Sequence, residues 1–317
     1  MKVLILGGSG FIGRHLLTKL LEKKYDIRLL TRDHNKKFPK NVDVFFGDIA
    51  NPNLDSLKLV NNCEVVFNCA GEINKKSKMM GVNFKGIQKI FNSFAKNNQF
   101  LNKHWVQLSS VGSYGPSFIP NLSRVVTEET PTNPIGLYEE TKTKADEFII
   151  NSSINFGISF AILRPSNVVG LEMPNQSFFR LVNSISKGRF FYVNSRKSLT
   201  NYVHVEDVVR ALLLCGFHKK AKNEIFNLSN DCFLKEIVEQ ILQVNNNKDN
   251  FICLPEWITR FVIRILSFFC EMQINKKVVN FLVSKTSYRC EKIYKKLNFK
   301  PSVHIPSFAK SLLVDTK

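Results

Sequence analysis

The sequence predicts an α/β protein with a Rossmann-type, doubly wound parallel sheet and a smaller, mostly helical C-terminal substrate lobe. Strand-like apolar runs alternate with helical patterns through the first half of the chain, which is typical of right-handed βαβ units. The first run, residues 3–6, leads directly into Gly7, Gly10 and Gly13, spaced three residues apart. A strand, a glycine turn and a helix in this order can hold the phosphates of a dinucleotide.

Apolar periodicity predicts the elements of the first half. Four leucines share one face of the stretch 15–24, which predicts an amphipathic helix packed on the sheet. Short apolar runs predict strands at residues 3–6, 27–30, 42–46, 65–69, 104–108 and 158–163.

The pattern changes after Gly170. A helix, two short strands and further helices are expected there, the first three near 178–187, 190–193 and 202–205. We therefore expect a dinucleotide-binding domain over residues 1–170 and a substrate-binding lobe over residues 171–317. A segment near 202–228 is expected to return to the core.

Composition limits the class of protein. The chain has 317 residues, 44% of them apolar, and can bury a sizeable core. Its seven cysteines form no C-x-x-C pair, which favours neither a metal site nor a disulfide framework. The first strand begins at once and no uncharged apolar stretch of about 18 residues is present, so we expect no signal peptide, no transmembrane helix and a cytoplasmic location.

The formal net charge of +19 favours an anionic partner. The lysines occur as short scattered pairs without interleaved aromatic residues, which is typical of a solvated surface rather than of a nucleic-acid site. We therefore expect no nucleic acid as partner, and a basic surface that helps to gather an anionic small-molecule substrate.

The glycine turn is expected to hold a dinucleotide through its backbone. Gly7 permits the sharp turn, Gly10 lets bare N–H groups approach the pyrophosphate, and Gly13 lets the helix pack tightly on the strand. Phe11 and Ile12 lie within this turn and are expected to share in cofactor binding.

Tyr138 and Lys142 stand four residues apart, so on a helix they share one face and can act on the same atom. A tyrosine with its ordinary pKa of about 10 is a poor base at neutral pH, and a nearby ammonium lowers that pKa. Lys142 can supply this charge and can also hold a nicotinamide ribose. The alternative is an exposed helix start after Pro134, because this spacing is common by chance.

Ser110 strengthens the catalytic interpretation. It follows the expected strand 104–108, at the carboxyl end of the sheet, where open α/β sheets bind ligands. Ser110 can donate a hydrogen bond to a substrate carbonyl while Tyr138 delivers or removes the proton. Ser109 and Ser113 are alternatives for this role.

Together these residues resemble the extended short-chain dehydrogenase/reductase family, the group of NAD(P)-dependent sugar epimerases, dehydratases and ketoreductases. Further matching segments span nearly the whole chain, at 47–49, 68–71, 163–170, 202–208 and 292–301. The resemblance implies catalytic roles for Ser110, Tyr138 and Lys142, substrate contacts for Asn83 and Asn167, and a homodimer. It also implies cofactor contacts for Tyr138 and Lys142 and for Asp48, Ile49, Cys69, Ala70, Gly71 and Pro165.

The end of the second strand bears on the choice of cofactor. Members of the family that use NAD usually carry an acid where Thr31 stands, and Arg32 beside it can pair with a 2′-phosphate. Asp33, the next residue, is an acid and favours NAD(H) instead. We favour NADP(H), with NAD(H) as the alternative, and NADP(H) in turn favours net reduction over epimerisation.

The residues after Ser110 bear on the reaction. Dehydratases of the family carry an Asp-Glu pair where Val111 and Gly112 stand, which disfavours dehydration. The arginine that nucleotide-sugar members commonly use is replaced by Thr200-Asn201, with Arg189, Arg196 or Lys197 as substitutes.

We therefore predict hydride transfer at a carbinol or ketone carbon of a nucleotide-activated sugar, by a 4-ketoreductase or an epimerase. One alternative is an NADPH-dependent reductase of a steroid- or flavonoid-like ketone. The other is a non-catalytic, cofactor-binding assembly subunit.

Residues 254–272 repeat apolar side chains near helical spacing, with Arg260 and Arg264 on a neighbouring face. Such a helix can lie on a membrane surface. Apolar stripes are usually buried, so we favour a core or subunit-contact helix and keep membrane contact as the alternative.

Overall fold

The computed structural model describes residues 1–97, 102–117, 119, 122–261 and 276–314. Its main feature is a seven-stranded sheet in the order β11-β7-β5-β4-β1-β2-β3, in which every neighbouring pair is parallel. The strands are β1 (Lys2–Leu6), β2 (Asp26–Thr31), β3 (Val42–Phe46), β4 (Val65–Asn68), β5 (His104–Leu108), β7 (Ser159–Pro165) and β11 (Glu224–Leu228). The strand order reverses between β1 and β4, which creates a crevice at their carboxyl ends.

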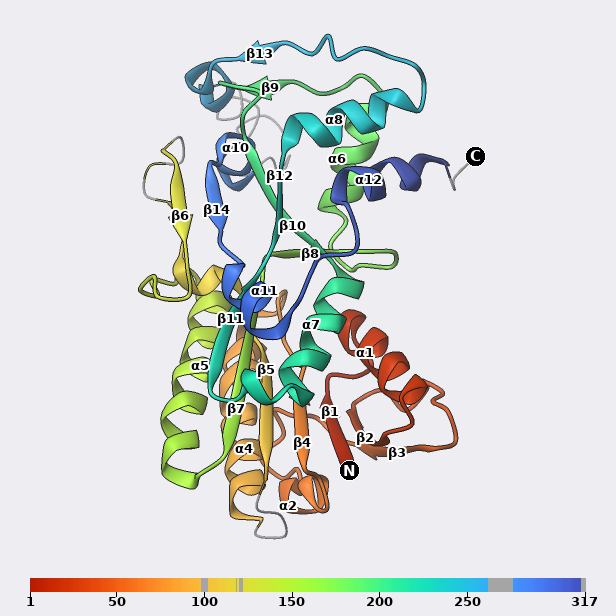
Figure 1. Cartoon of the computed structure of the whole chain (residues 1–317), viewed down its shortest axis with the longest axis vertical. Helices are drawn as coiled ribbons and strands as arrows, with labels where there is room; N and C mark the ends of the chain where they lie inside the picture. The colour runs from red at the N-terminus through yellow and green to blue at the C-terminus, as the bar shows by residue number, and fades with distance from the viewer. Residues whose placement is uncertain (98–101, 118, 120–121, 262–275, 315–317) are drawn as a thin grey trace.

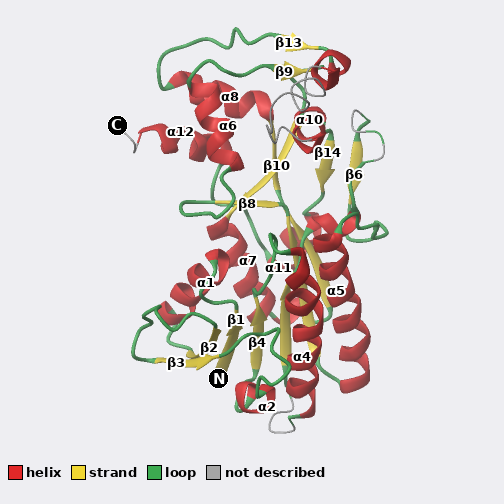
Figure 2. Ribbon diagram, turned by 180° about the vertical axis from the view of Figure 1, so that it is seen from behind, coloured by secondary structure: helices red, strands yellow, loops and turns green. Residues whose placement is uncertain are grey.

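Helices cover both faces of this sheet (Figure 1, Figure 2). On one face, Leu16 of α1 and Val208 of α7 belong to one buried cluster with the strands. On the other face, Leu59 of α2, Ile90 of α4 and Ile149 of α5 belong to a second cluster. The bounds are α1 (Phe11–Glu22), α2 (Ser56–Val60), α4 (Gly86–Lys96), α5 (Leu137–Phe156) and α7 (Val205–Phe217).

A smaller lobe lies at the opposite end of the molecule from the N-terminus (Figure 1). Its strands are β8 (Asn167–Val169), β9 (Tyr192–Val193), β10 (Leu199–His204), β12 (Asn230–Phe233) and β13 (Cys253–Leu254). Its helices are α6 (Ser177–Ser186), α8 (Leu234–Gln243), α10 (Lys276–Val283) and α12 (Ile305–Val314). Shorter connecting elements are α3 (Lys76–Met80), a π-helix (Gly81–Lys85), two 3₁₀ turns (Val111–Tyr114, Lys219–Ala221), β6 (Arg124–Val126), β14 (Thr286–Tyr288) and α11 (Glu291–Leu297).

The predicted fold class is confirmed, with differences at the element ends. Strands 42–46 and 104–108 have the predicted bounds. Helix α1 begins at Phe11, four residues before the expected start, because it follows the glycine turn directly. Strand β11 follows β8, β9 and β10 of the lobe in the sequence, and it returns to the main sheet as an edge strand. The domain boundary at residue 170 stays a prediction.

Of the expected core or subunit-contact helix over residues 254–272, the described part does not pack in the core, and a subunit contact stays a prediction. Trp257 and Phe261 are largely exposed, whereas Thr259 between them is buried. Residues 262–272 lie outside the described residues. Within the described chain, no helix has the length and apolar character needed to cross a bilayer.

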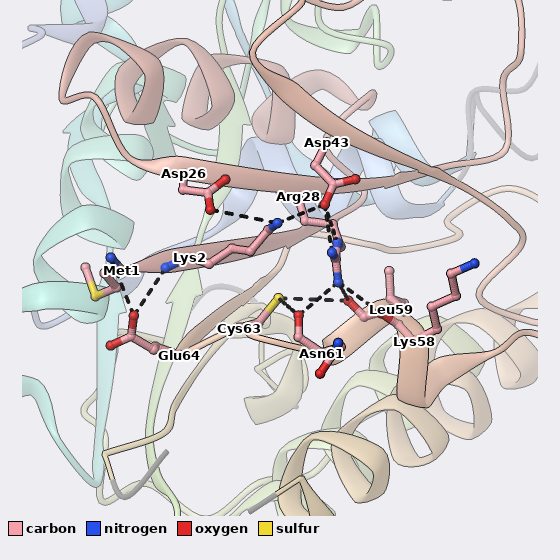
Figure 3. Close-up of polar contacts among 10 residues, drawn as sticks. All are labelled: Met1, Lys2, Asp26, Arg28, Asp43, Lys58, Leu59, Asn61, Cys63 and Glu64. Carbon is pink, nitrogen blue, oxygen red and sulfur yellow. Dashed lines mark hydrogen bonds and ion pairs between the residues drawn. The ribbon is translucent and has the colours of Figure 1, made fainter. Parts of the chain in front are cut away.

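A network of charges braces the amino end of the sheet (Figure 3). Arg28 on β2 donates through Nε to Asp43 Oδ2 on β3 at 2.8 Å. Its Nη1 donates to three carbonyl oxygens at the C-terminal end of α2. Lys2 Nζ lies 2.9 Å from the same Asp43 carboxylate and 3.8 Å from that of Asp26. This end of the sheet is therefore held by mutually neutralised side chains.

Candidate active site

Glycines shape the turn between β1 and α1. Gly7 has a φ of +75°, and a Cβ there would lie 2.7 Å from the backbone of Ala70. A Cβ at Gly13 would collide with the Gly7 carbonyl oxygen, so α1 can approach the turn only with glycine at this position. The N-cap, Gly10, supplies no side-chain cap to α1. The N–H groups of its first turn can therefore bind phosphate oxygens.

The turn opens into a cleft at the carboxyl ends of the central strands. Seven predicted cofactor residues line it, namely Gly7, Gly10, Arg32, Ile49, Cys69, Ala70 and Gly71. The lining is completed by five residues that were not predicted, Ser9, Leu30, Thr31, Gly47 and Val82. Outside the lining lie seven predicted residues, Phe11, Ile12, Gly13, Asp48, Tyr138, Lys142 and Pro165.

The side chains of Phe11 and Ile12 pack against the hydrophobic clusters of the protein. Their backbone N–H groups are therefore the atoms that can bind phosphate, and their part in cofactor binding stays a prediction. Gly13 contributes by close packing, and Pro165 is buried at the end of β7.

The outer end of the cleft carries groups that can contact an adenosine ribose. Thr31, the last residue of β2, is buried and places its Oγ1 3.3 Å from Ser9 Oγ. The exposed Arg32 guanidinium lies 3.5 Å from the Asp48 carboxylate. Arg32 and the predicted adenine-binding acid therefore lie side by side at the cleft edge.

In the loop after β2, the Asp33 carboxylate is bonded within the loop, whereas the Lys36 ammonium is bonded to the glycine turn. Asp33 Oδ1 accepts a hydrogen bond from the Asn35 N–H at 3.0 Å, so this carboxylate caps its own turn. Lys36 Nζ donates to the Ser9 carbonyl oxygen at 2.8 Å. A second cation thus stands beside the glycine turn, on the side of Arg32.

Lys142 occupies the centre of the site. This side chain is buried on α5, and its Nζ donates to the carbonyl oxygens of Leu108 at 2.9 Å and Ala70 at 3.1 Å. Burial lowers the pKa of Lys142 to about 8, and the nearby Asp146 carboxylate opposes this change. The ammonium is therefore still the main form at neutral pH, and it joins the end of β5 to the wall of the cleft.

Tyr138 lies one helical turn before Lys142, on the same face of α5. Burial raises the pKa of Tyr138 to about 12, and the carboxylates of Glu139 and Asp146 add to this rise. In the ligand-free protein the phenol is therefore the stable form at neutral pH. Ser110 accepts a hydrogen bond from the Gly112 N–H at 3.0 Å, and no described residue accepts from its hydroxyl.

Glu139 places a carboxylate beside these groups and was not predicted. A Cβ at Gly112 would lie 2.9 Å from Glu139 Cγ and 3.2 Å from Ser110 Oγ, so the glutamate side chain covers Gly112 next to the serine. Its position directly after Tyr138, in the first turn of the helix, was the available signal.

A buried ion pair fixes the end of β5 from behind. Asp146 on α5 accepts from Ser109 Oγ at 2.7 Å and from Arg164 Nε on β7 at 3.1 Å. All three side chains are buried. Ser109, an alternative to Ser110, is therefore engaged inside the protein. Asp146 was not predicted, although its place four residues after Lys142 puts it on the same helix face.

The two predicted substrate residues lie in different surroundings. Asn83, in the π-helix, is buried; it accepts from the Glu72 N–H at 2.7 Å and donates to the Glu72 carbonyl and to Thr141 Oγ1. Asn83 thus ties the loop after β4 to α5, and a substrate contact would require these bonds to open. Asn167 is exposed and donates to the Asn201 carbonyl oxygen at 3.2 Å.

The chain matches known proteins over most of its length. The model of the NAD dependent epimerase/dehydratase family matches residues 3–229. A putative UDP-glucose 4-epimerase of Methanocaldococcus jannaschii is 30% identical over 244 residues, 71% of this chain and 76% of the relative. A decarboxylating sterol-4-alpha-carboxylate 3-dehydrogenase of Mus musculus is 25% identical over 95% of this chain and 87% of the relative.

Solved structures share the fold. The UDP-glucuronic acid 4-epimerase of Bacillus cereus, in complex with NAD, superposes with a TM-score of 0.72 at 18% identity. The alignment covers 98% of this chain and 94% of that one.

Proposed function

The chain belongs to the NAD-dependent epimerase/dehydratase family, and from this premise we propose that it transfers hydride at a carbinol or ketone carbon of a nucleotide-activated sugar. The reaction is a 4-keto reduction or a 4-epimerisation. Curated relatives named as UDP-glucose 4-epimerases support the sugar-nucleotide substrate. The single observation that carries the proposal is the buried Lys142 ammonium, which bridges the cofactor cleft and the end of β5.

Each residue of the site has a proposed role. The nicotinamide ring supplies or accepts the hydride when it is bound. Ser110 donates a hydrogen bond to the substrate oxygen, because its hydroxyl oxygen accepts from Gly112 and none of the described residues accepts from the hydroxyl. Tyr138 donates the proton to that oxygen, or removes it in the reverse direction. Lys142 holds the ribose. Its expected lowering of the pKa of Tyr138 stays a proposal for the complex, because in the ligand-free protein burial and the carboxylates of Glu139 and Asp146 raise that pKa.

The protonation state of Tyr138 in the ligand-free protein is the one that reduction of a ketone requires, and the direction of the reaction stays a proposal. With a pKa of about 12, Tyr138 carries its proton at neutral pH and is ready to donate it to a ketone oxygen. Asn83 acts as a positioning residue, because its amide connects α5 with the loop that carries Glu72.

The cofactor is a nicotinamide dinucleotide, and we propose NADP(H) as the preferred form. Thr31 stands in place of an acid at the end of β2, the Asp33 carboxylate caps its own turn, and Arg32 and Lys36 flank Ser9. These cations can pair with a 2′-phosphate. Replacement of Arg32 by alanine is expected to weaken NADPH binding about tenfold more than NADH binding. Equal losses would contradict this preference.

A homodimer and a cytoplasmic location complete the proposal. Ile154 on α5 is 76% exposed, and an apolar side chain of this kind on a long surface helix is suited to a subunit contact. Light scattering on the purified protein distinguishes a monomer from a dimer.

A second candidate function is oxidation or reduction of a steroid-like carbinol or ketone. The mouse sterol dehydrogenase supports it, because that match extends over 95% of this chain.

The experiment that tests the function measures retained cofactor and turnover together. Mass spectrometry of the purified protein identifies bound NAD or NADP, and turnover is followed with UDP-glucose, a UDP-4-keto-6-deoxy sugar and a steroid ketone. Tightly retained NAD with UDP-glucose turnover identifies an epimerase, whereas NADPH oxidation with the keto sugar identifies a reductase. Turnover of the steroid ketone alone selects the second candidate. Cofactor binding without any turnover would overturn both.

A further inference from the structure

The two tryptophans of the chain lie in opposite environments. Trp105 is fully buried under α4, whereas Trp257 is 71% exposed at the far end of the lobe. Phe261 follows one helical turn later on the same face and is 60% exposed. Ile252, just before β13, is 63% exposed. The three exposed side chains belong to one short stretch, residues 252–261, and an exposed apolar surface of this kind marks a candidate contact site.

The aromatic side chains stand on an anchored helix start rather than on a loose loop. Glu256, directly before Trp257, accepts a hydrogen bond from Asn194 Nδ2 at 2.9 Å, and its own N–H donates to Asn194 Oδ1 at 2.8 Å. Arg260 Nε donates to Glu256 Oε1 at 2.8 Å, and Arg260 Nη2 donates to Asn280 Oδ1 on α10 at 2.7 Å. Trp257 and Phe261 are therefore presented to solvent by a fixed backbone.

The charge around this face is positive. Glu256 is paired with Arg260, and Asp249 is paired with Arg196 at 3.0 Å, so both local carboxylates are neutralised. Lys197 and Lys248 are the sequence neighbours of Arg196 and Asp249, and both are exposed. Neither lysine forms an ion pair with any acid in the described part of the chain.

We propose that this lobe-tip surface, formed by Ile252, Trp257, Phe261, Lys197 and Lys248, docks on an anionic lipid bilayer. Tryptophan and phenylalanine are favoured at the boundary between headgroups and acyl chains, and flanking lysines are attracted by anionic headgroups. Strands β9 and β13 lie at the end of the molecule opposite the N-terminus, so the tip can reach a flat surface (Figure 1, Figure 2). The contact is peripheral and needs no spanning helix.

Charge selects the bilayer over a second copy of this chain. A two-fold contact through the lobe-tip surface would bring Lys197 and Lys248 of both copies into one interface, and the described residues of this surface offer no unpaired acid to meet them. An anionic lipid surface supplies the missing negative charge. The proposal does not depend on which substrate the active site takes.

Tryptophan emission tests the contact directly. The full-length protein is mixed with vesicles of phosphatidylcholine alone or of phosphatidylcholine with 30% phosphatidylglycerol, and binding is read by co-sedimentation. The anionic vesicles are expected to bind at least tenfold more tightly and to shift the Trp257 emission to shorter wavelength. The variant Trp257→Phe is expected to keep binding and to lose the shift, because Trp105 is already buried.

Matched variants distinguish vesicle binding through the lobe-tip surface from non-specific binding. The double variant Trp257→Ala/Phe261→Ala and the variant Lys197→Glu/Lys248→Glu are each expected to lose at least tenfold in vesicle affinity. The control Leu57→Ala removes an equally exposed apolar side chain (61%) on α2, at the other end of the molecule, and is expected to bind as the parent does. Nicotinamide cofactor binding, measured in each variant, reports folding.

Three results would overturn the proposal. The first is no sedimentation with anionic vesicles. The second is sedimentation that the two double variants and the Leu57 control change equally. The third is concentration-dependent self-association that Trp257→Ala/Phe261→Ala abolishes without any vesicle binding, which would identify a second copy as the occupant.

Discussion

At the amino end of the sheet the Arg28 guanidinium meets the Asp43 carboxylate and three helix carbonyls, whereas at the carboxyl end the Lys142 ammonium meets only two backbone carbonyls among the described residues. Both cations are held by well-aligned bonds, but only the first is neutralised by an acid in direct contact. A buried cation without a bonded anion is suited to act on a ligand. The same sheet therefore uses charge for bracing at one end and keeps it for chemistry at the other.

The largest effect is expected where the carboxyl end loses its proton donor. The change Tyr138→Phe keeps the ring and removes the hydroxyl, so turnover should fall by about 10²–10⁴-fold. Cofactor affinity, measured by fluorescence titration, should stay close to that of the parent because Lys142 remains. Turnover within a few fold of the parent would show that Tyr138 is not the proton donor and that the carboxyl end of the sheet is not the site of the chemistry.

The carboxyl end also has a brace, and breaking it should affect stability more than any change at the amino end. The change Asp146→Asn leaves Arg164 buried without a charged partner, which costs about 3–5 kcal/mol in the free energy of unfolding. Urea unfolding measures this loss. The control Ser109→Ala removes one hydrogen bond to the same carboxylate and should cost about 1 kcal/mol. Equal small losses in the free energy of unfolding for both variants would contradict the proposal that the Asp146–Arg164 ion pair stabilises the end of β5.

Local spacing explains which parts of the site could be predicted. Gly7, Gly10 and Gly13 follow a strand directly, and Tyr138 and Lys142 lie one turn apart, so both signals are contained in short segments. Asp146 acquires its role only when β5, α5 and β7 bring residues 109, 146 and 164 together. No spacing within one segment indicates such a contact.

The interpretation of residues 254–272 had a different weakness. Apolar periodicity shows which side chains share a helix face, but it does not show what covers that face. Trp257 and Phe261 share a face as expected, and the structure leaves it open to solvent. The substrate contact of Asn83 stays a prediction, and in the ligand-free protein its amide is bonded to Glu72 and Thr141.

A change at the amino end should affect stability and leave catalysis alone. The change Arg28→Met removes the bonds to Asp43 and to the end of α2, and we expect a loss of about 1–3 kcal/mol in the free energy of unfolding with unchanged kcat and KM. A change in kcat would contradict the separation of the two ends.

Low pH should reduce the difference in free energy of unfolding between the parent and Arg28→Met. Burial opposes ionisation of Asp43, but the bonds from Lys2 and Arg28 outweigh it and hold the pKa of this carboxyl below its ordinary value of 3.8. A lowered pKa stabilises the fold above pH 3.8, and the contribution is lost as the pH falls through the lowered value. The difference in free energy of unfolding between the parent and Arg28→Met should therefore become smaller below that pH, and the part that comes from the carbonyl bonds of Arg28 should remain.

The smallest expected effect distinguishes two acids at the carboxyl end that stand next to each other on α5. Burial is the main cause of the raised pKa of Tyr138, and the Glu139 carboxylate is the next, so Glu139→Gln should lower that pKa while the side chain still covers Gly112. Oxidation of an alcohol requires the phenolate, and its rate rises with pH below the pKa of Tyr138. In Glu139→Gln this rising limb should therefore move to lower pH. Glu140, exposed and absent from the groups that act on Tyr138, supplies the matched control, and Glu140→Gln should follow the parent profile. If both variants superposed on the parent, the charge of Glu139 would have no part in the raised pKa of Tyr138, and burial with the Asp146 carboxylate would account for it.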